Sequence, residues 1–181
     1  MKTDARVRYT KKVLREALLK CMETRPVNQI TVKEVCELAG LNRATFYKHY
    51  RDCFDLLEQL ENEMLEQLGE SLRDLSSLDA KALVSSIFDM IDSNYELCRV
   101  LVFSGNDVSF VRKIVALARE RSVPLWKKYL KRATDEEMDM LFICLASGLL
   151  MVIEQTYGKY DREQVTRFVN STVKNCLSPY V

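Results

Sequence analysis

The sequence predicts an all-α protein, and three observations support this prediction. First, the 181 residues include only five glycines and three prolines, and a shortage of turn residues favours long helices over many short strands. Second, apolar residues recur at helical spacing along most of the chain. Third, a composition of 48% hydrophobic and 29% charged residues is that of an ordinary globular protein. We therefore expect about nine helices.

Local sequence signals mark the ends of the first three predicted helices. Apolar residues at helical spacing predict a helix over residues 5–24, which Pro26 closes. Thr31 and Glu34 form a capping box, with Ile30 stapled onto Val35, and begin a helix over about 31–38. Gly40 suits the turn that follows. Asn42 then caps a third helix over 43–49.

Six further helices are predicted from the pattern beyond residue 52. Asp52 caps a helix that runs to about Leu75, and Asp79 begins one that runs to about Asn94. A short helix over 95–103 precedes a break at residues 104–107. Pro124 is expected to kink or split the helical segment 108–132. Two last helices are predicted for residues 134–157 and 162–177.

Charge is distributed unevenly along the chain, although the net charge is only +1. Residues 1–52 contain twelve Lys and Arg against six Asp and Glu, a net charge of +6, and the remainder carries −5. This asymmetry suggests a polyanion-binding domain at 1–52 and a second domain at 53–181. The alternative is a solvated helix that happens to be basic.

Two short helices joined by a turn that contains Gly40 form a helix-turn-helix, whose second helix enters the major groove of DNA. At about 100° per residue, Phe46 and Tyr50 share the packed side of that helix. Ala44, Thr45 and Lys48 lie roughly opposite and face outward. A helical corner without a ligand is the competing interpretation.

The segment ITVKEVCELAGLNRATFYKHYRDCFDLL, residues 30–57, resembles the DNA-binding signature of the tetracycline-repressor (TetR) family. The layout of a small N-terminal domain followed by a helical body is similar too. The resemblance implies contacts with base edges, phosphates or the groove edge, or a bracing role, for Thr31, Lys33, Arg43, Ala44, Thr45, Tyr47, Lys48, His49 and Tyr50. Many family members have a lysine where this chain has Cys53, so one phosphate contact is lost or passes to Arg51.

The predicted body offers two further candidate surfaces. The body contains enough aromatic residues to line an effector cavity, although helical cores use such residues too. These residues are Phe88, Tyr95, Phe103, Phe110, Trp126, Tyr129 and Phe142. Two apolar stripes on the last two helices predict a homodimer interface at Leu141, Leu145, Leu149, Val165, Phe168, Val169 and Val173. Alternatively, both stripes close the core of a single chain.

The sequence lacks the motifs of metal, redox and catalytic sites. Six cysteines without a CxxC pair and a single histidine do not match a zinc or redox site, so we expect no metal, no cofactor and no catalytic residues. Residues 135–139 (DEEMD) resemble an acidic metal motif, but Thr134 and Glu137 read as a capping box. The basic cluster at 112–132 is a solvated face or a site for an acidic partner.

The function predicted from these patterns is transcriptional regulation, and more specifically repression. A homodimer would bind a near-palindromic double-stranded operator, and an unidentified small-molecule effector or a protein partner would release it. A charged N-terminus and a longest uncharged run of fourteen residues predict a cytoplasmic protein without a membrane span. A helical protein-interaction module is the alternative function, and an enzyme is not expected.

Overall fold

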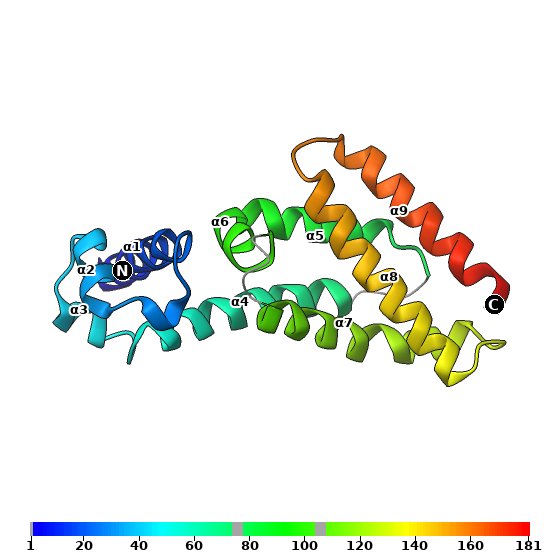
Figure 1. Cartoon of the computed structure of the whole chain (residues 1–181), viewed down its shortest axis with the longest axis horizontal. Helices are drawn as coiled ribbons and strands as arrows, with labels where there is room; N and C mark the ends of the chain where they lie inside the picture. Colours follow the sequence, from blue (N-terminus) through cyan, green and yellow to red (C-terminus); the bar gives the residue numbers. More distant parts are fainter. Residues whose placement is uncertain (1, 74–77, 104–107) are drawn as a thin grey trace. The chain divides into compact units, whose positions relative to one another are not determined.

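The computed structural model describes residues 2–73, 78–103 and 108–181, and no strand occurs among them. The all-α prediction is confirmed (Figure 1). The α-helices are α1 (Lys2–Met22), α2 (Val32–Ala39), α3 (Arg43–Tyr47), α4 (Cys53–Arg73), α5 (Lys81–Ser93), α6 (Tyr95–Cys98), α7 (Val108–Tyr129), α8 (Asp135–Thr156) and α9 (Arg162–Leu177). Short helical turns cover Val27–Gln29, Arg99–Phe103 and Ser178–Tyr180.

Most predicted helix ends agree with the structure to within two or three residues. The third helix ends at Tyr47 rather than at residue 49, because the backbone N–H groups of His49 and Tyr50 both turn back to the carbonyl of Phe46. The predicted split at Pro124 is wrong, since α7 continues through this residue without interruption. The predicted end at Leu75 and the predicted break at 104–107 lie outside the described residues.

The chain divides into two compact units. The first comprises Met1–Glu63 and Glu96–Asn106, and the second comprises Met64–Tyr95 and Asp107–Val181. Helix α4 contributes its first half to one unit and its second half to the other.

The first unit has a core of fully buried side chains from α1, α2, α3 and α4. Leu14 and Leu18 of α1, Val35 of α2, Phe46 of α3 and Leu56 of α4 have no exposed surface. Burying a side chain of this size contributes about 1.5–3 kcal/mol. The positions of α2 and α3 on α1 therefore follow from packing rather than from the intrinsic stability of such short helices, which is marginal.

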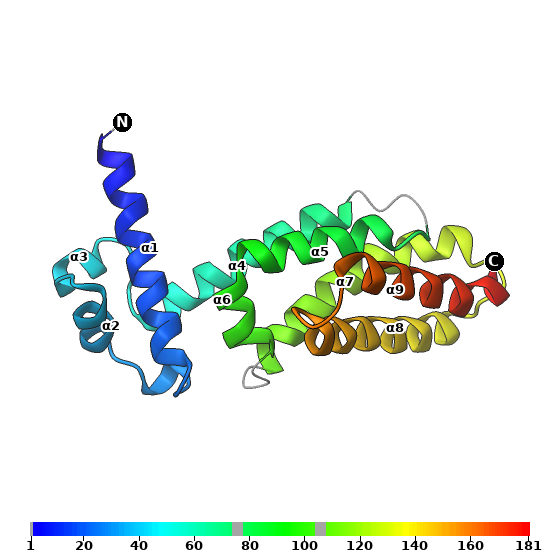
Figure 2. The ribbon, with the colours of Figure 1, turned by 90° about the horizontal axis from the view of Figure 1, so that it is seen from above.

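In the second unit, α9 packs against α5 and α8, and α8 packs against α7. Helices α8 and α9 form an antiparallel hairpin, and α9 also packs along α5 (Figures 1 and 2). At one end of this contact the Arg162 guanidinium donates to the carbonyl oxygen of Ser85 at 2.6 Å and to Asp89 at 2.7 Å. At the other end Lys174 contacts Asp79 at 2.8 Å.

None of the helices in the described residues combines the length and the apolar character that crossing a bilayer requires.

Candidate nucleic-acid interface and ligand cavity

Local hydrogen bonds fix the geometry of the α2–turn–α3 unit. The Thr31 hydroxyl donates to the Glu34 carboxylate at 2.7 Å, and the Thr31 backbone N–H donates to the same oxygen at 2.8 Å. These two bonds and one from Arg25 lower the pKa of Glu34 to about 2. Gly40 ends α2 with φ of +65°, a conformation that favours glycine. The Asn42 side chain then accepts from the backbone N–H of Thr45 at 2.8 Å and begins α3.

Helix α3 has one buried side and one exposed side, as its sequence predicts. Phe46 is fully buried and Tyr50 is only 5% exposed, and burial raises the pKa of Tyr50 to about 12. The Phe46 and Tyr50 rings contact each other with centroids 5.7 Å apart. Tyr50 thus braces α3 from the core side, whereas the Tyr47 ring is 58% exposed.

The exposed side of α3 brings together most of the residues that the sequence assigns to DNA. Arg43, Ala44, Tyr47 and Lys48 are exposed, and Thr45 and His49 are half-buried. These residues are close in sequence, and Ala44, Thr45 and Lys48 project from the side opposite buried Phe46 and Tyr50. We call Arg43, Ala44, Thr45, Tyr47 and Lys48 the α3 surface.

Other predicted contact residues already have intramolecular partners. Thr31 is occupied by its capping box with Glu34, and Lys33 lies 3.8 Å from the Glu37 carboxylate on the exposed side of α2. The Thr45 hydroxyl donates to Asn42 at 3.0 Å, which leaves its methyl group as the free part of the side chain.

Position 53, at the start of α4, holds a cysteine where the resemblance to the TetR family leads one to expect a lysine. Cys53, the first residue of α4, is buried, and burial raises the pKa of its thiol to about 11. Arg51 is exposed, but its guanidinium lies 3.3 Å from Asp55. Asp55 also accepts from the Arg51 backbone N–H at 2.8 Å. The positive charge of Arg51 is therefore partly balanced by the Asp55 carboxylate.

Two exposed features of the first unit were not assigned to DNA from the sequence. Leu38, on the last turn of α2, is 55% exposed. Arg6 and Lys11 of α1 are exposed as well. The basic composition of residues 1–52 predicts positive charge on α1. Helical periodicity, however, does not predict which of these cations lack an acidic partner.

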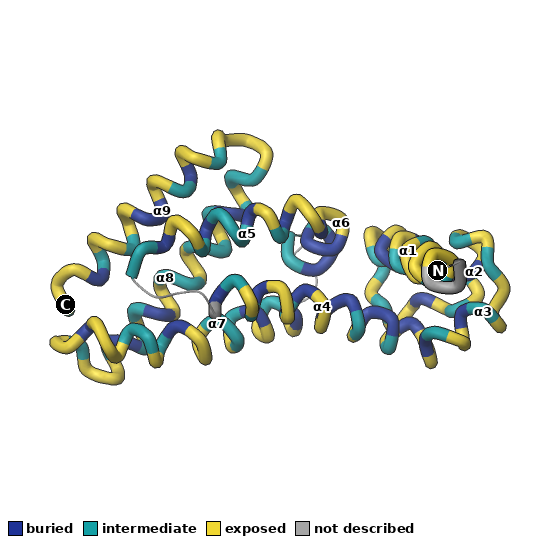
Figure 3. Tube along the Cα trace, turned by 180° about the vertical axis from the view of Figure 1, so that it is seen from behind, coloured by how far each residue is buried: buried dark blue, intermediate teal, exposed yellow. Residues whose placement is uncertain are grey.

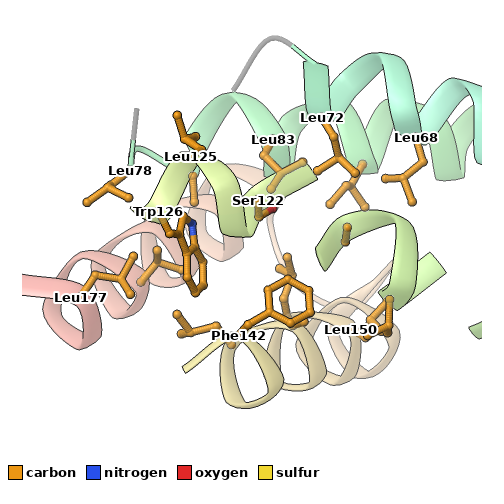
Figure 4. Close-up of a pocket in the computed structure, with 18 of the residues that line it drawn as sticks. Leu68, Leu72, Leu78, Leu83, Ser122, Leu125, Trp126, Phe142, Leu150 and Leu177 are labelled. Atoms are coloured by element: carbon orange, nitrogen blue, oxygen red, sulfur yellow. The ribbon is translucent and has the colours of Figure 1, made fainter. Parts of the chain in front are cut away.

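The second unit contains an apolar cavity of about 120 Å³ (Figure 4). Helices α4, α5, α7, α8 and α9 all contribute to its wall, with Leu72, Leu83, Leu125, Phe142 and Leu177 among the lining side chains. Among the described residues of the lining, Asp79 and Ser122 carry polar side chains, and Trp126 adds an indole N–H. Asp79 is paired with Lys174, whose hydrogen bond is the largest cause of the lowered pKa of this carboxyl. A space with this largely apolar lining suits a neutral apolar molecule.

The aromatic residues predicted to line an effector cavity are dispersed. Trp126 and Phe142 line the cavity, and their rings contact each other at 5.9 Å. Phe88 is buried in the cluster with Val165 and Val169, and Phe110 is fully buried. The remaining three lie away from the lining: Tyr95 and Tyr129 are exposed, and Phe103 is half-buried. Aliphatic side chains, which the sequence analysis did not name, form most of the wall.

The residues predicted to form a dimer interface mostly face the interior of the single chain. Val165 and Val169 are buried against α5, Leu145 and Leu149 line the cavity, and Leu141 and Val173 pack on buried clusters. Phe168, in contrast, is 60% exposed. The exposed apolar side chains of the hairpin are Met140, Ile143, Met151 and Phe168, on the stretches of α8 and α9 that are yellow in Figure 3. We call these four residues the hairpin face.

The acidic segment at 135–139 is explained by local structure. Thr134 and Glu137 form the predicted capping box. Asp135 pairs with Lys127 at 2.8 Å, and Asp139 pairs with Arg119, so these acids also neutralise part of the basic cluster on α7. Within the described ranges, no group of His, Cys, Asp or Glu side chains has the arrangement of a metal site.

Comparisons with known proteins agree with this architecture. No protein-family model matches the sequence. An uncharacterised HTH-type transcriptional regulator of Bacillus subtilis (strain 168), YxbF, is 38% identical over 64 residues. Those residues make up 35% of this chain but only 17% of that protein, so the match spans about a sixth of the relative.

Solved structures match along nearly the whole chain. A TetR transcriptional regulator from Streptococcus agalactiae 2603V superimposes with a TM-score of 0.67 and 23% identity, and covers 96% of this chain and 98% of its own. The dihydroxyacetone kinase operon activator DhaS has a TM-score of 0.60 and 14% identity, with 94% and 97% coverage. These relatives are described as regulators of transcription, which agrees with the prediction that the chain is not an enzyme. The chain has the all-α fold of TetR transcriptional regulators, the family whose DNA-binding signature residues 30–57 resemble.

Proposed function

We propose that this protein is a DNA-binding transcriptional regulator that inserts α3 into the major groove of its operator. The observation that carries the proposal is the α3 surface, with its two cations and three small or aromatic side chains. The capping hydrogen bonds of Thr31 and Asn42 hold α2 and α3 in the arrangement that a helix-turn-helix requires.

Each residue of the α3 surface has a role that suits its chemistry. Arg43, in the first turn of α3, reads guanine through a bidentate hydrogen bond. Lys48, at the end of the helix, contacts phosphate and displaces counterions. Ala44 and the Thr45 methyl group contact thymine methyl groups. The exposed Tyr47 hydroxyl donates to phosphate.

The protein acts as a homodimer in the cytoplasm on a near-palindromic operator. The hairpin face supplies the contact between subunits, because Met140, Ile143, Met151 and Phe168 expose apolar surface on neighbouring helices. A second copy of the chain offers the same surface, as a two-fold interface requires. Each subunit then places one α3 helix in one half-site.

The cavity of the second unit binds the effector. Its largely apolar lining, to which Ser122 contributes a hydroxyl group, suits a small neutral apolar molecule rather than an ion. The effector releases the operator if it prefers an arrangement of the dimer that binds DNA poorly. We propose repression as the direction of control, although DhaS, an activator, shares the fold. Control through a protein partner is the variant of this proposal.

Selection of bound sequences from random duplexes tests the proposal. We expect enrichment of a near-palindrome with half-sites about one helical turn, or a small multiple of a turn, apart. Failure to retard any duplex in a gel at low salt would contradict DNA binding and would favour a helical protein-interaction module. The selected duplex then serves to test the effector, because a ligand of the cavity must weaken its binding.

A further inference from the structure

We infer that Arg6 and Lys11, which we call the α1 basic surface, form a second contact with the DNA backbone beside the groove contact of α3. The inference rests on the proposed function and adds to it a part of the protein that lies outside the helix-turn-helix. The expected partner group is the phosphate of duplex DNA.

The first support is the distribution of ion pairs in the first unit. Most cations of this unit are already neutralised: Lys12 pairs with Glu16, Arg15 with Glu63, Lys20 with Glu23, Arg25 with Glu34, Lys33 with Glu37, Arg51 with Asp55, and Arg99 with Glu23 and Glu96. Among the described side chains of the unit, no ion pair is present for Arg6, Lys11, Arg43 or Lys48. The unneutralised cations thus occur on the α3 surface and on α1.

This distribution matters because a paired cation contributes little field at a distance. A phosphate that approaches Lys12 or Lys20 also approaches a carboxylate, whereas Arg6 and Lys11 present uncompensated charge. Surface ion pairs individually contribute little to folding stability. The distribution of paired and unpaired cations therefore matters mainly for where a polyanion is attracted.

The second support is the part of α1 that carries these residues. No side chain from residue 5 to residue 13 is buried, and the buried side of α1 begins at Leu14. Figure 2 shows the first turns of α1 continuing past α2 and α3 of the same unit. Packing in the core therefore does not account for the exposed Arg6 and Lys11 of these turns.

The third support is the direction in which the two cations project. At 100° per residue, half-buried Val7 and Thr10 continue the buried stripe of Leu14 and Leu18 on α1, which packs against α2 of the helix-turn-helix. Arg6 and Lys11 flank this stripe, each within about a quarter of a turn of it. They thus border the same side of α1 as the helix-turn-helix, while Tyr9 faces away. A duplex held by α3 and a phosphate contact from α1 are compatible with this arrangement.

The test compares two double variants that remove the same charge. Arg6→Gln/Lys11→Gln removes the α1 basic surface, and Lys12→Gln/Lys20→Gln, the matched control, removes two paired cations of the same helix. Glutamine keeps a high helix propensity, and melting followed by circular dichroism checks that both variants fold. Binding to the selected operator and to an unrelated duplex is measured between 50 and 200 mM salt.

We expect the first variant to reduce the slope of log K against log salt by about 1.8 per bound subunit, since each phosphate contact contributes about 0.9. The factor by which affinity falls between 50 and 200 mM salt is then about tenfold smaller per subunit than for the parent protein. The loss of affinity should be equal on both duplexes, because phosphate contacts carry no sequence information. The control should change the slope by less than half as much.

The outcomes separate this inference from the proposed function. An unchanged slope for the first variant, or equal slope changes for both variants, overturns the α1 contact while leaving DNA binding intact. A parent protein that binds neither duplex overturns the proposed function and the α1 contact together.

Discussion

The side-chain oxygen of Asn170 on α9 accepts a 2.8 Å hydrogen bond from the backbone N–H of Ala80, the residue that precedes α5. Asn170 is only 5% exposed and Ala80 only 8%. A buried polar side chain therefore attaches the last helix to the start of a helix ninety positions earlier.

Replacing Asn170 tests the importance of this bond. Asn170→Ala leaves the Ala80 N–H buried without an acceptor, which costs about 1–3 kcal/mol of unfolding free energy. Asn175→Ala, at an exposed position of the same helix, is the control and should change stability by less than about 0.5 kcal/mol. Urea denaturation measures both, and equal effects would show that the buried bond is unimportant.

The α2 capping box gives a second prediction. Thr31→Ala removes the side-chain oxygen that accepts from the Glu34 backbone N–H, and we expect a loss of about 1 kcal/mol in stability. Thr31→Ser keeps this oxygen and should retain most of the stability. Chemical denaturation distinguishes the two, and an equally large loss for serine would mean that the threonine methyl group, rather than the cap, is responsible.

Alkaline pH should destabilise the protein. Burial raises the pKa of Cys98 to about 12, that of Cys53 to about 11 and that of Tyr50 to about 12. Because the folded pKa lies above the unfolded value in each case, these groups contribute their full stability below pH 9, and the contribution is lost as pH rises from 9 towards 12.

Measurements of unfolding free energy at pH 8 and pH 10.5 check this prediction. Cys53→Ala removes one of the three groups and should therefore flatten the decline. A stability that stays constant over this interval would mean that the three groups ionise without unfolding the core.

The hairpin face provides a test of dimerisation. Phe168→Glu places a charge on the exposed apolar surface and should weaken the proposed dimer, as seen by sedimentation across a dilution series. Tyr160→Glu alters an equally exposed ring in the turn between α8 and α9 and serves as the control. A chain that is monomeric at every concentration before substitution would contradict the dimer itself.

Arg43 and Lys48 should differ in their effect on DNA recognition. Arg43→Ala is expected to cost about 1–3 kcal/mol on the preferred site and to relax specificity there. Lys48→Ala should weaken binding to specific and random duplexes alike. Equal losses on both duplexes for Arg43→Ala, at one salt concentration, would refute its role in reading bases.

Helix caps and the turn after α2 were predictable because their partners lie within a few residues. The capping boxes Thr31–Glu34 and Thr134–Glu137, the Asn42 cap and the turn at Gly40 all occur as predicted. Each depends on hydrogen bonds or dihedral angles spanning about four residues, so the sequence contains all the participants.

The sequence by itself therefore determined the helices, their caps and the buried side of α3. Only the tertiary structure decided which side of α8 and α9 is exposed, which aromatic rings reach the cavity and which cations keep an acidic partner. Helix α8 has apolar residues around most of its circumference, so periodicity does not select the face that meets α5, α7 and α9. Val165 and Val169 are buried while Phe168 is exposed, because the position of α5 alone distinguishes these sides of α9.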